Sequence, residues 1–290
     1  MKETREEMQP LIDQDIRQRH YGMEDSMRAI GWLIALMGVL LSGCVSAQGT
    51  NEQTRQALAP NGPLRVAFLA GPLYATQDAG TGEFKGVAID LGRGIAARLG
   101  VPMQPVVYPN PGGIMAGAKT GEWDVAFIGM SAERATAVDF SAPYMEVEQG
   151  YLVRAGLPIT TAAEVDRPGV RVGVIEKAGA DVFLSGALKS ATLVRVRSTD
   201  ELAALLASGN ADVIAATKAF LFGRLASQPD ARVLDGRILV EPIAAAVPKG
   251  RDPTAAREVA QFVEDAKRSG QAKSAIDRAG LRGVVAAPLN

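Results

Sequence analysis

Short apolar runs alternate with amphipathic stretches along most of this 290-residue chain. The apolar runs of strand length are 64–69, 103–108, 123–128, 170–175 and 210–216. Between the first two, Leu91, Ile95 and Leu99 recur every fourth residue, as on one face of a helix that Gly100 closes. Because alternating strand and helix units form parallel sheets covered by helices, the sequence predicts an α/β fold. A chain of this length that is 47% hydrophobic has enough core for about two domains.

Capping residues mark two further helices. Ser198, with Glu201 three positions later, has the pattern of a capping box. Asp252 followed by Pro253 is typical of a helix start, and Gly270 is typical of a helix end.

The N-terminal region predicts export. Arg28 precedes an apolar run, 29–45, that is short for a bilayer span of roughly 20 residues. Its basic start and small-residue end are typical of a secretory signal. Within it, 41–44 reads Leu-Ser-Gly-Cys and resembles a bacterial lipobox, in which Cys44 would carry the lipid. An uncleaved anchor helix and ordinary cleavage after Ala47 are alternatives to the lipobox. All three interpretations predict that the rest of the chain is exported.

The region before the first strand divides into three expected segments. Residues 1–26 are charged and fit no signal peptide, so we interpret them as an extension produced by a gene start placed too early. Residues 27–44 are the expected lipoprotein signal peptide. Residues 45–62, rich in Ser, Gln, Asn, Thr and Ala, are expected to form a flexible tether.

The exported part lacks two residue types that carry much protein chemistry. The single histidine is His20 and the single cysteine is Cys44. We therefore expect no disulfide, thiolate nucleophile, imidazole base or His/Cys metal ligand, and hence no metal, no cofactor and no catalysis. The formal net charge of −1 gives no reason to expect a nucleic-acid partner.

Four segments together resemble the extracellular solute-binding proteins of family 3, the receptors of polar amino-acid ABC importers. These segments are LRVAFL (64–69), GEFKGVAIDLGRGIAARLG (82–100), GEWDVAFIGMSAERATAVDFSAPY (121–144) and ADVIAAT (211–217). The third is the most specific, because several residue types recur in the family's order. The resemblance covers roughly residues 63–283.

The resemblance implies a two-lobed type II periplasmic-binding fold, in which each lobe is a mainly parallel sheet flanked by helices. Lobe 1 would combine 63–150 with 243–283, and lobe 2 would be 154–240. The chain would cross between the lobes near 148–154 and again near 238–249, and these hinges would let the lobes close on a ligand.

The same resemblance implies a ligand anchor. In the family, the arginine of a T-x-x-R motif grips the carboxylate of the ligand, and here Arg134 and Ser131 match the arginine and the threonine. A guanidinium suits this role because its planar fork can give two parallel hydrogen bonds to one carboxylate. Gly129 and Met130 would form the adjacent wall, although the segment from Asp124 to Arg134 is shorter than in the family.

Further candidates come from other positions around the implied cleft. Tyr74 follows the first strand, and Asn110 follows the second. Lys177 and Gly179 precede an expected helix start, where free amides favour anions. Tyr74, Asn110 and Lys177 could equally have ordinary loop, core or surface roles. Thr217 stands where the family has the acid that binds the α-ammonium of the ligand.

Thr217 is neutral and is followed by Lys218, which would repel an ammonium if it faced the cleft. An ammonium enclosed without a carboxylate loses several kcal/mol of hydration. We therefore expect a carboxylate-bearing ligand without a free α-ammonium, or one whose ammonium points elsewhere, unless Asp181 or Glu176 supplies the missing charge.

The leading hypothesis is a lipid-anchored, non-enzymatic receptor in the periplasm or cell envelope. It would deliver a small carboxylate-bearing solute, an amino acid or related organic acid, to an ABC transporter permease. The alternative is an exported enzyme of the cyclohexadienyl dehydratase type on the same fold, for which the sequence offers no evident pair of carboxylates at a cleft position. A third class, the sensor domain of a receptor, would need a membrane span or kinase after Asn290.

Overall fold

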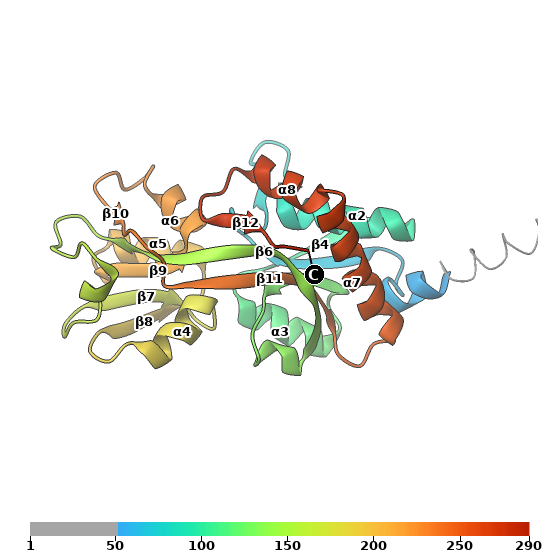
Figure 1. The fold of residues 1–290 in the computed structure, drawn as a ribbon, viewed down its shortest axis with the longest axis horizontal. Coiled ribbons are helices and arrows are strands. Elements are labelled where there is room, and N and C mark those ends of the chain that lie inside the picture. Colours follow the sequence, from blue (N-terminus) through green and yellow to red (C-terminus); the bar gives the residue numbers. More distant parts are fainter. Residues whose placement is uncertain (1–51, 290) are drawn as a thin grey trace, which may run out of the picture. The chain divides into compact units, whose positions relative to one another are not determined.

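In the computed structural model, which describes residues 52–289, ten strands join in one mixed sheet (Figure 1). Along the main path their order is β4-β1-β5-β11-β6-β9-β7-β8, and β10 and β12 both pair with β6. The strands are β1 (Leu64–Leu69), β4 (Met103–Tyr108), β5 (Val125–Gly129), β6 (Val138–Val153), β7 (Arg171–Ile175), β8 (Thr192–Val196), β9 (Val213–Thr217), β10 (Arg232–Val233), β11 (Leu239–Pro248) and β12 (Val284–Ala286). A separate small hairpin pairs β2 (Thr76–Gln77) with β3 (Phe84–Lys85).

The sheet consists of two parallel groups joined by two long antiparallel strands. In lobe 1, β1 pairs in parallel with β4 and β5, and in lobe 2, β7 pairs in parallel with β8 and β9. Between them, β6 and β11 run antiparallel to each other, and β6 also pairs antiparallel with β9. The strands β6 and β11 therefore connect the two groups. The lobe boundaries expected from the sequence stay predictions.

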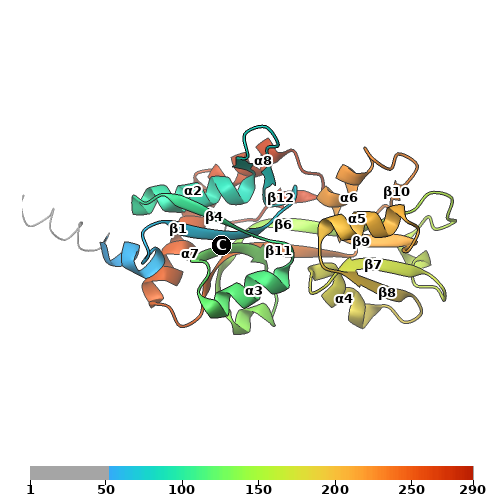
Figure 2. The same ribbon diagram turned by 180° about the vertical axis from the view of Figure 1, so that it is seen from behind.

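Helices cover both faces of each group, as Figure 1 and the reverse view in Figure 2 show. Those of lobe 1 are α2 (Val87–Leu99), α3 (Pro111–Thr120), α7 (Pro253–Arg268) and α8 (Gln271–Ala279). Those of lobe 2 are α4 (Gly179–Ala187), α5 (Thr199–Ala207) and α6 (Lys218–Arg224). Two short 3-10 helices, η1 (Arg134–Thr136) and η2 (Ala162–Glu164), lie in connections. The predicted α/β architecture is confirmed.

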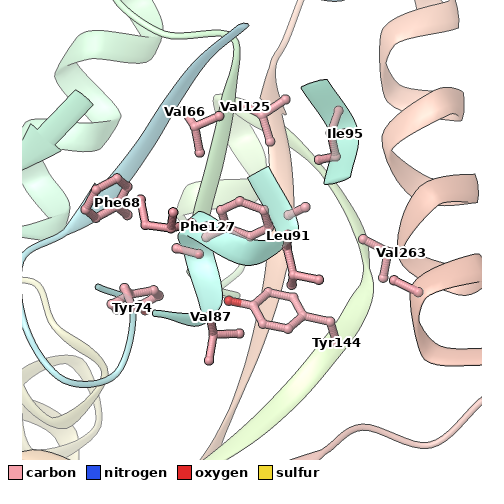
Figure 3. Packing of buried hydrophobic residues seen from close by; sticks show 14 of the residues in the cluster. Val66, Phe68, Tyr74, Val87, Leu91, Ile95, Val125, Phe127, Tyr144 and Val263 are labelled. Carbon is pink, nitrogen blue, oxygen red and sulfur yellow. The ribbon is translucent and has the colours of Figure 1, made fainter. Parts of the chain in front are cut away.

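The apolar strand runs pack as the sequence predicts. In the lobe 1 core, side chains of β1 and β5 meet the inner faces of α2 and α7 (Figure 3). Phe127 and Tyr144 make an edge-to-face ring contact with centroids 5.5 Å apart. Trp123 is fully buried, and its indole N–H donates to the carbonyl of Ile114.

Both lobes use the same arginine–aspartate clamp at the start of their central strands. In lobe 1, Arg65 donates to the Asp124 carboxylate through its backbone N–H and two guanidinium nitrogens at 2.8–3.0 Å. In lobe 2, Arg171 makes the same three kinds of bond to Asp212. Each aspartate immediately precedes its strand, so the clamp fixes the register between two neighbouring strands that are far apart in the chain.

The helix caps follow the sequence with one exception. Asp252 accepts from the amide of Thr254 and caps α7. Ser198 caps α5 by accepting from the amide of Glu201, but the Glu201 carboxylate accepts from the amide of Arg197 rather than that of Ser198. The expected reciprocal capping box is therefore only half formed.

The tether predicted over 45–62 is wrong in its second half. Residues 54–58 are helical, and Leu58 and Ala59 are buried in the lobe 1 core. The Leu58 carbonyl accepts from the guanidinium of Arg251. The polar composition of the segment hid this packing, because only two of its described residues, Leu58 and Ala59, are buried. Residues 45–51, together with the expected extension, signal peptide and Cys44, lie outside the described residues.

Within residues 52–289, no helix combines the length and the apolar character that a membrane crossing requires.

Candidate functional site

One cavity lies where the central strands of both lobes end. Leu69 and Ile128 belong to β1 and β5, and Ile175 and Thr217 are the last residues of β7 and β9. The cavity has a volume of about 700 Å³ with its open mouth included. In open α/β sheets, ligands bind outside the carboxyl ends of the strands, so this is the expected place for a site.

Arg134 enters this cavity from lobe 1 and is buried there. Its position follows from η1, which begins directly at this residue, and from Ser131, whose hydroxyl accepts from the Arg134 amide at 3.2 Å. The guanidinium donates to the carbonyl of Gly129 at 2.6 Å and, across the cleft, to the carbonyl of Lys177 at 2.7 Å. Arg134 therefore links the two lobes as well as lining the cavity.

A carboxylate that the sequence interpretation missed lies beside Arg134. Glu241, from the connecting strand β11, has its Oε1 3.5 Å from Nη1 of Arg134, and both side chains are about nine-tenths buried. Its other oxygen accepts from the side-chain amide of Gln149 in β6 at 2.6 Å. Both Glu241 and Gln149 line the cavity. A single acid inside the apolar run 238–248 was the one sequence signal that could have identified Glu241.

Two glycines make room for the Glu241 carboxylate. A Cβ at Gly179 would lie 2.6 Å from Oε2 of Glu241, and a Cβ at Gly129 would overlap Oε1. Gly129 belongs to lobe 1 and Gly179 to lobe 2, so the carboxylate is held between the lobes in the lining of the cavity. A side chain at either position would displace it.

Burial and charge act in opposite directions on this acid. Burial raises the pKa of the Glu241 carboxyl, and the charge of Arg134 and the Gln149 hydrogen bond offset only part of that rise. Burial also raises the pKa of the Tyr74 hydroxyl well above its ordinary value, and the charge of Glu241 adds to the rise.

Three of the further candidates from the sequence line the cavity. Tyr74 is buried beside Arg134 and Glu241. Gly179 is the first residue of α4. Thr217 lines the cavity while its hydroxyl caps α6 by accepting from the amide of Phe220. Their roles as ligand contacts stay predictions.

The remaining candidates lie around the cavity without lining it. Asn110 caps α3 and donates to the carbonyl of Arg197 at 3.1 Å, a second contact between the lobes. Lys177 has an exposed side chain and a φ of 60°, and its carbonyl is the group that faces Arg134. The Met130 amide donates to the carbonyl of Pro242. These residues, with Ser131 and Gly129, contribute positioning contacts in this structure.

The charged residues weighed in the ligand argument lie elsewhere. Lys218 pairs with Glu148 at 2.7 Å and does not line the cavity. Asp181 accepts from the Lys177 amide and pairs with Arg195, and neither it nor Glu176 lines the cavity. The expectation of a ligand without an ammonium rested on a cleft without a carboxylate. Glu241 removes that basis.

In the part of the chain that the structure describes, no three His, Cys, Asp or Glu residues are grouped so that they could hold a metal ion.

The family model for bacterial extracellular solute-binding proteins, family 3, matches residues 64–279. No curated protein sequence matches the chain.

Three solved structures are similar. The lysine-complexed binding component of an ABC transporter from Wolinella succinogenes is 26% identical, with a TM-score of 0.66 over 75% of this chain and 95% of its own. The solute receptor for L-cysteine of Neisseria gonorrhoeae is 25% identical, with a TM-score of 0.68 over 77% and 92%. An ancestral amino-acid-binding protein, a precursor of cyclohexadienyl dehydratase, is 24% identical, with a TM-score of 0.67 over 78% and 98%.

Proposed function

Because the chain belongs to the bacterial extracellular solute-binding proteins of family 3, we propose that it is a lipid-anchored receptor that delivers a small carboxylate-bearing solute to an ABC importer. The solute is an amino acid or a related organic acid, and the protein releases it unchanged. Its place of action is the periplasm or cell envelope.

The observation that supports this function is the position of Arg134. It is a buried cation that lines a cavity between two lobes. A guanidinium has five N–H donors, and within residues 52–289 two of its nitrogens donate to backbone carbonyls. The donors that remain can hold a carboxylate. Because Arg134 also binds the Lys177 carbonyl of lobe 2, binding of a ligand to Arg134 is coupled to closure of the lobes.

Calorimetry with Arg134→Ala tests this role. Removing one partner of a buried charge pair costs roughly 2–5 kcal/mol, so affinity for an L-α-amino acid or its 2-hydroxy analogue should fall by about 30-fold to several thousand-fold. Arg134→Lys should recover only part of the loss, because an ammonium cannot reproduce the planar fork. Arg98→Ala is the control, since Arg98 pairs with Asp265 on the surface and should leave affinity unchanged. Unaltered binding by Arg134→Ala would refute the anchor role.

The lipid anchor is proposed from Leu-Ser-Gly-Cys at 41–44. Cys44→Ala should release the protein from membranes or leave it as an unprocessed precursor in fractionated cells. A wild-type protein that fractionates as soluble and begins after Ala47 would refute the anchor.

A second candidate is an exported enzyme of the cyclohexadienyl dehydratase type. One observation favours it: burial raises the pKa of the Glu241 carboxyl inside the cavity, as in many general acids. We favour binding because this carboxylate is already paired with Arg134 and Gln149. Steady turnover of a cyclohexadienyl acid, proportional to protein concentration and lost in Glu241→Gln, would establish the enzyme instead.

A further inference from the structure

We propose that Arg134 and Glu241 together bind the head group of an α-amino acid, and that the ligand has an uncharged, mainly apolar side chain. Arg134 holds the carboxylate, and Glu241 holds the ammonium. This inference rests on the proposed function and names the substrate class for the same site.

The two protein charges have the spacing that such a head group requires. Oε1 of Glu241 lies 3.5 Å from Nη1 of Arg134, and both residues line the same cavity. The carboxylate and ammonium of an α-amino acid are attached to a single carbon, so they too are close together. In this structure the arginine and the glutamate neutralise each other, which avoids the several kcal/mol that an isolated buried charge costs.

Glu241 also has unused capacity to accept hydrogen bonds. A carboxylate offers about four lone-pair sites. Among residues 52–289, the hydrogen bond that this carboxylate accepts comes from Gln149. The 3.5 Å approach of Arg134 exceeds the roughly 2.7–2.9 Å of a charge-assisted hydrogen bond. An ammonium has three donors that can fill the open sites, and its positive charge favours the ionised form of the carboxyl.

The rest of the lining determines the side chain. Arg134 and Glu241 are the two charged residues that line this cavity, so the lining is neutral as a whole. Apart from Tyr74 and Gln149, its large uncharged side chains are apolar, namely Leu69, Leu73, Ile128, Ile175 and Phe220. A cationic or anionic side chain would lose its hydration here without a partner, and the cost is several kcal/mol per ion.

Thr217 is consistent with this assignment. It lines the cavity from lobe 2 and pairs in register with Gln149, the residue that binds Glu241. The negative charge is thus present in the cavity, but it is supplied by β11 instead of the end of β9. An acid introduced at position 217 would place a second carboxylate on the same cavity.

The test is calorimetry on the purified full-length protein with matched compounds. The apolar probes are L-alanine, L-leucine and L-phenylalanine, and the charged probes are L-arginine and L-glutamate. Each apolar probe is compared with its 2-hydroxy acid and with the amine that lacks the carboxylate. We expect an apolar amino acid to bind at least about 30-fold more tightly than its 2-hydroxy acid, its amine and both charged amino acids.

Glu241→Gln should lose about 30-fold to several thousand-fold in affinity for that amino acid and leave the affinity for its 2-hydroxy acid equal or higher. Adding Thr217→Asp to Glu241→Gln should restore part of the amino-acid affinity. The control is Glu148→Gln, because Glu148 pairs with Lys218 and Arg237 away from the cavity and its loss should not change binding. The comparison of analogues on the wild-type protein decides the question even if Glu241→Gln does not fold.

Two outcomes separate this inference from the proposed function. If a 2-hydroxy acid binds as tightly as its amino acid, or Glu241→Gln binds the amino acid unchanged, Glu241 is not the ammonium site. If a charged amino acid binds as tightly as every apolar amino acid, the assignment of an apolar side chain is wrong. In both cases the receptor function stands. If no carboxylate-bearing compound binds the wild-type protein, the proposed function fails as well.

Discussion

The ion pair between Arg134 and Glu241 should contribute to the stability of the empty protein, and a double-mutant cycle can measure its contribution. The perturbations are Arg134→Ala, Glu241→Gln and the two combined. Each single change leaves one buried group without its charged partner, because both side chains are about nine-tenths buried.

The magnitude follows from the separation and the burial. At 3.5 Å and an effective dielectric constant of about 20, the Coulomb energy of the pair is about 5 kcal/mol. Relaxation and water entry reduce this, and residues in contact show interaction energies of roughly 0.5–3 kcal/mol. We expect a coupling of about 2–3 kcal/mol. Because Glu241→Gln removes the unpaired buried carboxylate that Arg134→Ala leaves, the double variant should be more stable than Arg134→Ala.

Urea unfolding of the ligand-free protein measures these free energies. The matched control is the pair Lys273–Asp277 on α8, whose N–O distance of 2.6 Å is shorter but whose side chains are 68% and 60% exposed. Its coupling should be at most about 0.5 kcal/mol. A coupling for Arg134–Glu241 that is no larger than this control would show that burial does not strengthen the pair and would refute the reasoning.

Three further predictions concern the scaffold. Asp124→Asn should destabilise the protein by roughly 3 kcal/mol in urea unfolding, because two arginine side chains donate to this fully buried carboxylate, and an unchanged midpoint would contradict the clamp. Gly86→Ala should destabilise it by about 1–3 kcal/mol and weaken ligand binding, because the new Cβ would lie 2.5 Å from the carbonyl oxygen of Tyr74, and wild-type affinity and stability would refute this. Backbone amides that donate to Glu164 lower its pKa to about 2, so its stabilising effect is complete above its ordinary value of 4.5 and is lost as the pH falls towards 2. The stability difference between wild type and Glu164→Gln should therefore shrink over that range in acid unfolding, and a constant difference would exclude the linkage.

Local sequence patterns were enough to predict much of the fold. The run 64–69 became β1 residue for residue, and Asp252 capped α7 as expected, because hydrophobic periodicity and capping depend on residues close together in the chain. The long strands β6 and β11 were not predicted as strands. They pair antiparallel with segments about 100 residues away, and this pairing is not encoded in any local period.

The candidate site divides in the same way. The position of Arg134 could be predicted because the motif around it lies in one continuous segment. The apolar character of the strand ends could also be predicted, because the strands are apolar runs in the sequence. The role of Glu241 was not visible, since its carboxylate meets Arg134, Gln149, Gly129 and Gly179 only when five separate elements come together. The free energy of a buried charge depends on neighbours that are distant in sequence. Strand register and lobe packing bring those neighbours together, so they decide which charges share a buried cavity.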